Sequence, residues 1–117
     1  MIIRIHKDRA IEALGNFDAL VEREIEEHLG GFVERITRLE VVIADENGIR
    51  KGPEDKRVTI TAHPAGRKMV AVTAHADKVE TAITRAAKKL FKALERSFGK
   101  DKVWKRKNRP GPRRPAV

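Results

Sequence analysis

The chain has no cysteine, no tyrosine, one tryptophan and four phenylalanines among its 117 residues. Without cysteine, neither a disulfide nor a thiolate metal site can form. Because aromatic residues make up only 4% of the chain, the core must be aliphatic. No hydrophobic run approaches the roughly 18 residues of a membrane span, and the N-terminus does not resemble a signal peptide. These absences predict a cytoplasmic protein with no membrane partner.

The length and the charge distribution narrow the class of protein further. A chain of 117 residues is long enough for one domain and too short for two ordinary ones. The net charge is +9, and it is concentrated near the C-terminus. Residues 98–117 carry eight basic residues and one acidic residue, whereas residues 1–77 carry twelve basic and fourteen acidic residues. This asymmetry favours an anionic partner, of which nucleic acid is the commonest.

Residues 77–97 have the clearest pattern in the chain. Apolar residues recur at spacings of three, four and seven, which predicts a helix with one buried face: Val79, Ile83, Ala86, Ala87, Leu90 and Leu94. Basic residues keep nearly the same period about 120–150° away: Lys78, Arg85, Lys89, Lys92 and Arg96, with Lys88 just beside them. A helix face that serves solubility alone usually mixes charge signs. We therefore interpret this helix as both a packing element and a polyanion-binding surface.

The remaining patterns predict four strands and one more helix. Strands are expected over residues 1–6, 39–43, 57–63 and 67–74, where apolar and polar residues alternate. Residues 7–15 are expected to be a connection that is helical in part. Apolar residues at helical spacing between positions 17 and 32 predict a helix capped by Asn16 and ended by Gly30 and Gly31. Its outer face would repel phosphate, because it carries four acidic residues: Glu22, Glu24, Glu26 and Glu27.

The element order is thus β-α-β-β-β-α, which predicts an α+β fold. The first two strands should be parallel, because a helix joins them, and the last three should form an antiparallel meander. Each helix has one apolar face, so both should cover the same side of a four-stranded mixed sheet. The result is a two-layer sandwich over residues 1–98. Residues 99–117 are rich in proline and basic residues, which predicts a disordered tail.

Several segments of the chain also carry a family resemblance. They are ITRLEV at 36–41, ADENG at 44–48, DKR at 55–57, AVT at 71–73 and the helix over 82–94 with AAKKL at its centre. In order and spacing they resemble the ribosome hibernation promoting factors, also described as sigma-54 modulation or ribosome-associated inhibitor proteins. The resemblance covers residues 1 to about 98.

The resemblance implies a fold similar to double-stranded RNA-binding domains, and a function. Such proteins bind the 30S subunit or the 70S ribosome at the mRNA and tRNA channel and inhibit translation during stress or stationary phase. The chain resembles the short form, which lacks the domain through which long members pair ribosomes, so a monomer is expected. The acidic first helix departs from better-known members, which have basic residues there. The positions that match residues contacting 16S rRNA are Arg85, Lys88, Lys89, Lys92 and Arg96.

The basic tail adds a second set of expected contacts with rRNA. Lys105, Arg106 and Lys107 follow Trp104, whose ring could stack on an RNA base. The same ring could instead fold back onto the end of the helix near Phe98. The sequence leaves both arrangements open.

The chain shows none of the common catalytic patterns. It has no Ser–His–Asp set, P-loop or dinucleotide fingerprint, so we expect neither an enzyme nor a cofactor nor a small-molecule substrate. Its four histidines lack zinc-ligand spacing, so no metal site is expected. An acidic group near residue 45 could bind a cation, but the DENG segment more simply forms a turn: Asp45, Glu46, Glu54 and Asp55.

Two other functions stay open on the sequence. The basic helix could serve a general binder of structured RNA or of nucleic-acid duplexes, with similar affinity for arbitrary sequences. The open face of the sheet, or the acidic helix, could instead serve a protein–protein adaptor. The charge pattern and the resemblance together favour binding to the ribosome.

Overall fold

The computed structural model describes residues 1–46 and 54–99. Four strands form one sheet in the order β1 (Ile2–Lys7), β2 (Ile36–Asp45), β3 (Lys56–Pro64) and β4 (Val70–Ala76). Strand β1 is parallel to β2, and the other two pairs are antiparallel. Both the mixed sheet and its strand directions were expected from the sequence, and they are confirmed.

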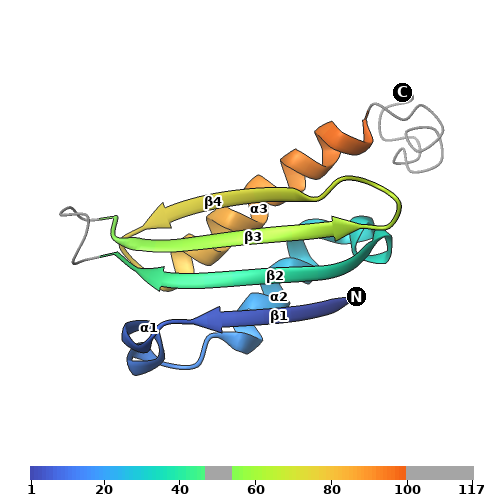
Figure 1. The fold of residues 1–117 in the computed structure, drawn as a ribbon. Helices are drawn as coiled ribbons and strands as arrows, with labels where there is room; N and C mark the ends of the chain where they lie inside the picture. The colour runs from blue at the N-terminus through green and yellow to red at the C-terminus, as the bar shows by residue number, and fades with distance from the viewer. Residues whose placement is uncertain (47–53, 100–117) are drawn as a thin grey trace.

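Helices cover one face of this sheet and leave the other open (Figure 1). Helix α2 (Asp18–Leu29) and helix α3 (Val79–Phe98) lie on the same face, and their apolar sides share one core with the strands. The α+β class and the two-layer arrangement are therefore confirmed. The element order has two additions, because a short helix α1 (Arg9–Leu14) and a 3₁₀ helix η1 (Gly30–Arg35) flank α2.

Helix α1 lies in the segment that the sequence indicated as a connection. Asp8 begins it, because one carboxylate oxygen accepts a hydrogen bond from the Ile11 backbone N–H at 2.9 Å. The other oxygen accepts from the Asp45 N–H at 3.0 Å and so joins α1 to the end of β2. Ile11 is fully buried. One aspartate thus satisfies two backbone donors and directs one isoleucine into the core.

Helix α2 begins one residue later than expected and ends where expected. Phe17 and not Asn16 is its capping position, and the Asn16 side chain accepts a hydrogen bond from the Asp18 N–H at 3.0 Å just before the first turn. The helix ends at Leu29, because Gly30 adopts φ +54°, a left-handed conformation that favours glycine. Phe32 therefore enters the core from η1. The helical spacing had placed it on α2 instead.

The core consists of aliphatic side chains from the inner face of the sheet and from the helices. Alternate residues of β2 and β3 are fully buried, whereas α3 contributes residues at helical spacing. Burying one such leucine, isoleucine or valine contributes about 1.5–3 kcal/mol. Three of the four phenylalanines gather at one end, where the Phe32 ring centroid is 5.6 Å from that of Phe91 and 5.4 Å from that of Phe98.

The other end of the sheet is held by charges. The Lys56 ammonium at the start of β3 donates to the Asp55 carboxylate at 2.8 Å and lies 3.6 Å from the Asp45 carboxylate on β2. The Glu46 N–H donates to the Asp55 carbonyl at 2.7 Å. The hydrogen bond from Lys56 lowers the pKa of the Asp55 carboxyl below 3.8. Two of the acidic residues considered as cation ligands, Asp45 and Asp55, are thus paired with a lysine, and the second half of the predicted DENG turn lies outside the described residues.

The Asp55–Lys56 pair makes the stability dependent on pH. Because the pKa of Asp55 is depressed in the folded state, its contribution is present above pH 3.8 and is lost as the pH falls through the folded value. Replacing Asp55 with asparagine should therefore destabilise the protein at pH 6 and change its stability less and less as the pH falls below 3.8. Urea unfolding of both proteins across this range measures the difference. Asp77→Asn, at an exposed position, is the control, and a pH-independent difference for Asp55→Asn would contradict the assignment.

Candidate nucleic-acid interface

The position of the basic residues follows from how α3 packs. Its buried residues face the sheet and α2, and they are Val79, Ala82, Ile83, Ala86, Ala87, Leu90, Leu94 and Phe98. Side chains at other positions of the helix point away from this core. Four of them recur at spacings of four, three and four, and we call them, together with the neighbouring Lys88, the basic ridge: Arg85, Lys88, Lys89, Lys92 and Arg96. All five are exposed.

Lys78 does not belong to the basic ridge, although its spacing had placed it there. It occupies the position before α3, where its backbone is extended, with φ −124° and ψ 146°. Its carbonyl accepts the hydrogen bond from the Ala82 N–H at 3.0 Å, which opens the first turn of the helix. A residue before the first turn does not follow the direction of helical side chains. Periodicity alone could not locate this boundary.

Two residues of the basic ridge bind the sheet. The Lys89 ammonium donates a hydrogen bond to the Thr73 carbonyl at 2.7 Å, and Arg85 donates to the His75 carbonyl at 2.7 Å. Both carbonyls belong to β4, which is an edge strand. Arg85 also donates to the Glu54 carboxylate at 3.1 Å. These side chains satisfy backbone acceptors that an edge strand would otherwise offer to another chain.

The other three residues of the basic ridge are more available to a ligand. Within residues 1–46 and 54–99, Lys88, Lys92 and Arg96 have no hydrogen-bond or ion-pair partner. A lysine carries three donors and an arginine five, so even Lys89 and Arg85 keep donors for a phosphate. The basic ridge therefore offers a line of positive charge beside the free edge of β4.

Sequence reasoning missed two basic residues near the basic ridge. Arg67 and Lys68 lie in the turn between β3 and β4, and together with Arg96 they line one surface hollow. The fourth strand was expected to begin at residue 67, but it begins at Val70, because the Arg67 N–H donates to the Pro64 carbonyl and closes a turn. Two adjacent basic residues at the predicted start of this strand were the available signal.

Helix α2 presents a different charge. Glu22, Glu26 and Glu27 are exposed as expected, but Glu24 is only 7% exposed and faces α3. Its carboxylate accepts a hydrogen bond from the Thr84 hydroxyl of α3 at 2.9 Å. The prediction that Glu24 lies on the outer face is therefore wrong. The spacing of a polar residue does not reveal a partner on another helix.

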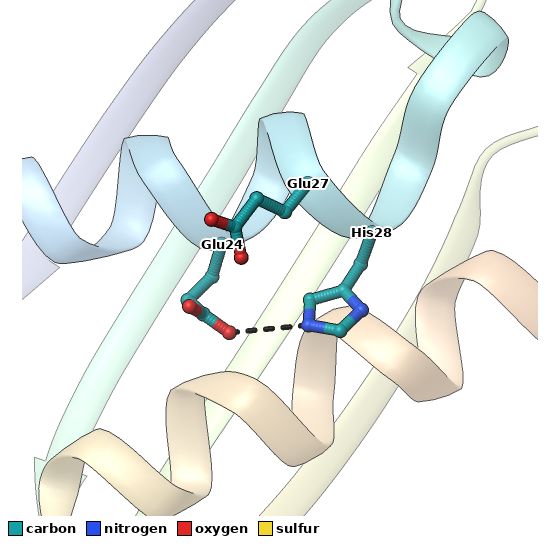
Figure 2. A group of neighbouring side chains, drawn as sticks. All are labelled: Glu24, Glu27 and His28. Atoms are coloured by element: carbon teal, nitrogen blue, oxygen red, sulfur yellow. Dashed lines mark ion pairs between the residues drawn. The ribbon is translucent and has the colours of Figure 1, made fainter.

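Glu24 belongs to a cluster that has the residue types of a metal site (Figure 2). Potential ligand atoms of Glu24, Glu27 and His28 lie within 4.8 Å of one another. The Glu24 carboxylate is 3.2 Å from His28 Nε2, and both side chains meet near α3. Because Glu24 already contacts His28 and Thr84, the cluster has a structural explanation: it joins α2 to α3 through a satisfied, buried carboxylate.

The open face of the sheet carries the other three histidines. The strand register places His6, His63 and His75 on three different rows, so these rings are not brought together. Charges on this face pair among themselves in two groups, at the two ends of the strands: Arg38 with Glu40 and His63, and Glu46 with Arg57 and His75. Arg38 and Arg57 on this face are thus already engaged with acidic side chains.

Comparisons with known proteins agree with this architecture. The family model described as Sigma 54 modulation protein / S30EA ribosomal protein matches residues 5–102. The chain belongs to this family.

The fold of this S30EA family member is similar to those of solved proteins from Thermus thermophilus and Coxiella burnetii. The N-terminal domain of Thermus thermophilus Protein Y shares 22% identity with a TM-score of 0.62, covering 82% of this chain and 98% of that one. A ribosomal subunit interface protein from Coxiella burnetii shares 16% identity with a TM-score of 0.61, covering 82% of this chain and 96% of that one. No curated protein sequence matches significantly.

The family resemblance deduced from ordered segments is therefore confirmed. Ribosome-associated modulation factors make up the S30EA family, which is not a known enzyme family. Within the described residues, no helix is long and apolar enough to cross a membrane. The predicted tail contacts at Lys105, Arg106 and Lys107, and the ring of Trp104, lie outside the described residues.

The contact between α2 and α3 can be tested through Glu24. Replacing Glu24 with alanine should lower the free energy of unfolding by about 1–3 kcal/mol, because it removes the partner of Thr84 and His28 at a buried position. Urea unfolding at neutral pH measures this loss. Glu27→Ala, on the same helix and exposed, should stay within about 0.5 kcal/mol of the wild type. Equal effects of the two substitutions would contradict the assignment.

The bond from Lys89 to the edge strand gives a second prediction. Lys89→Ala should destabilise the RNA-free protein by about 0.5–1.5 kcal/mol, because the Thr73 carbonyl loses a donor. Lys92→Ala removes the same charge from the same helix and should change stability by less than about 0.5 kcal/mol. Denaturant unfolding in the absence of RNA compares them. If Lys92→Ala were the more destabilising variant, Lys89 would have no special role at the edge.

Proposed function

We propose that this protein binds the small ribosomal subunit through 16S rRNA at the mRNA and tRNA channel and inhibits translation during stress or stationary phase. It acts in the cytoplasm as a monomer, with no cofactor or substrate. One observation carries the proposal: a member of the S30EA family presents five exposed basic residues along one rigid helix.

The shape of the basic ridge suits structured RNA. The deep, narrow major groove of A-form RNA excludes side chains, so proteins read its phosphates, its 2′-hydroxyls and its shape. A 20-residue helix holds the spacing of its side chains fixed, and cations on it can follow a line of phosphates with little ordering cost. Phosphate contacts position a protein without reading sequence. Selectivity for the ribosome then comes from the shape of the channel.

The charges of the two helices suggest the direction of approach. Exposed acidic residues on α2 repel a phosphate backbone, whereas α3 and the neighbouring edge of β4 attract it. RNA is therefore expected along the side of α3 that faces β4 and away from α2. In this proposal the tail residues Lys105, Arg106 and Lys107 add contacts beyond the end of α3.

Sedimentation with purified 30S subunits across a salt series tests the proposal. Five neutralised phosphates give a slope of log affinity against log salt of about −3.5 to −4.5. Changing Lys88 and Lys92 together to glutamate should weaken binding and reduce the magnitude of that slope by about 2, one unit for each lost contact. These two residues are preferred to Arg85 and Lys89, because the latter also hold the edge of β4.

Two controls sharpen this experiment. Arg9→Glu makes the same change of charge at an exposed position on α1, away from α3, and should leave sedimentation unchanged. A plain RNA duplex separates a ribosome-specific protein from a general RNA binder. If the wild type stays in the supernatant with 30S subunits at low salt but binds the duplex, the ribosomal function is wrong. If neither binds and an unrelated protein partner does, the adaptor alternative takes its place.

A further inference from the structure

A surface hollow lies between the β3–β4 turn and the last turns of α3. It encloses about 540 Å³ and opens to solvent. In the view of Figure 1, this turn lies beside the C-terminal part of α3. Six residues line it, three from each element: Gly66, Arg67 and Lys68 from the turn, and Ala93, Arg96 and Ser97 from the helix.

The lining has the chemistry of an anion site. Two arginines and one lysine supply three positive charges from two separate elements, and none of the lining residues is acidic. Arginine and lysine side chains are hydrogen-bond donors and never acceptors, and Ser97 adds a hydroxyl donor. Such a site attracts a tetrahedral oxyanion, whose oxygens accept several hydrogen bonds at once.

The site is also held in place before a ligand arrives. The Arg67 guanidinium carbon lies 4.3 Å above the centre of the Phe98 ring, and that ring packs on Phe32 in the core. The turn itself is tied to η1 by a hydrogen bond from the Ala65 N–H to the Arg35 carbonyl at 3.0 Å. A cation that is already stacked loses less side-chain freedom on binding.

Small residues keep the hollow open. Gly66 has φ +70°, and a Cβ added there would meet no atom within 4 Å, so the absent side chain leaves free space. Ala93 and Ser97 form the helix side with little volume. The C-terminal end of a helix repels anions, so the attraction must come from the three cationic side chains and should weaken with salt.

We propose that this hollow binds one phosphate group of an RNA backbone and so extends the basic ridge onto the β3–β4 turn. The proposal rests on the function proposed above and adds Arg67 and Lys68 to the interface. It assigns Arg96 to the hollow as well as to the ridge. The three cationic side chains favour a phosphate, and a phosphate contact positions the RNA without reading its sequence.

Inorganic phosphate is the first probe, since it tests the hollow without the ribosome. Titrating the ¹⁵N-labelled full chain with sodium phosphate at constant ionic strength should shift the amide signals of Gly66, Lys68 and Ser97 more than those of Lys88 and Lys92. Lys68→Ala should weaken phosphate binding about two- to fivefold, the value of an exposed ion pair. Ala93→Glu places a carboxylate in the hollow and should weaken it further, whereas Ala93→Gln, of the same size, controls for volume. If phosphate shifted the amide signals of both sets equally, or shifted neither set, the proposal that phosphate binds in the hollow would be wrong.

Binding to 30S subunits and to a plain RNA duplex is the second measurement. Because Arg67 and Arg96 still face the phosphate, Lys68→Ala should reduce the salt slope, by no more than about 0.7–0.9, the value of one phosphate contact, and Arg9→Ala should not change it. Local phosphate shifts combined with an unchanged slope on both RNAs would mean an adventitious ion only and would overturn the proposal. If 30S subunits do not bind the wild type, the ribosomal function fails, and the slope on the duplex alone decides whether the hollow contacts RNA.

Discussion

The burial of one aliphatic face of α3 against β3, β4 and α2 determines where positive charge can lie on this protein. Eight buried residues fix the rotation of the helix about its axis, so the basic residues at the complementary positions must emerge on the solvent side and beside β4. Rotating the helix by one residue position, about 100°, would bring lysines into the core, where an unpaired charge is very costly. The position of the basic ridge is thus a consequence of the packing.

The same packing leaves charge of opposite sign on the two helices. Helix α2 has its exposed glutamates on the far side of the α2–α3 contact, and its one inward-facing glutamate is satisfied by Thr84 and His28. Elsewhere several acidic residues are matched with bases: Lys56 with Asp45 and Asp55, and Arg57 with Glu46. Exposed acidic side chains thus dominate the outer side of α2, whereas Lys88, Lys92 and Arg96 of α3 have no ion-pair partner among the described residues.

Much of the fold could be predicted, because its elements follow strong local patterns. The aliphatic period of α3 and the alternation in β2 and β3 come from burial on one face, and burial is what a sequence pattern records. The element order then determined the strand directions. Helix α1 was indicated only as a partly helical connection and η1 was not predicted, because each is only six residues long. Phe32 kept helical spacing although Gly30 had already ended the helix.

The interface was predictable only where it follows that helical period. Arg85, Lys88, Lys89, Lys92 and Arg96 are exposed on α3 as expected. Lys78 was misplaced, because a helix boundary depends on the backbone conformation of one residue. The position of Glu24 depends on a partner sixty residues away, and the hollow depends on a turn meeting the end of a helix. Contacts between distant segments leave no periodic trace in a sequence.

The hydrogen bonds from Arg85 and Lys89 to β4 also bear on how this surface evolves. Under the proposed function, natural selection acts on these two positions twice, once through RNA binding and once through the solubility of a chain with an open strand edge. A lineage that changed its RNA partner would be free to alter Lys88 and Lys92, whereas substitution of Arg85 or Lys89 would carry a second cost. Sequence variation at these two positions is therefore a record of edge protection as much as of recognition.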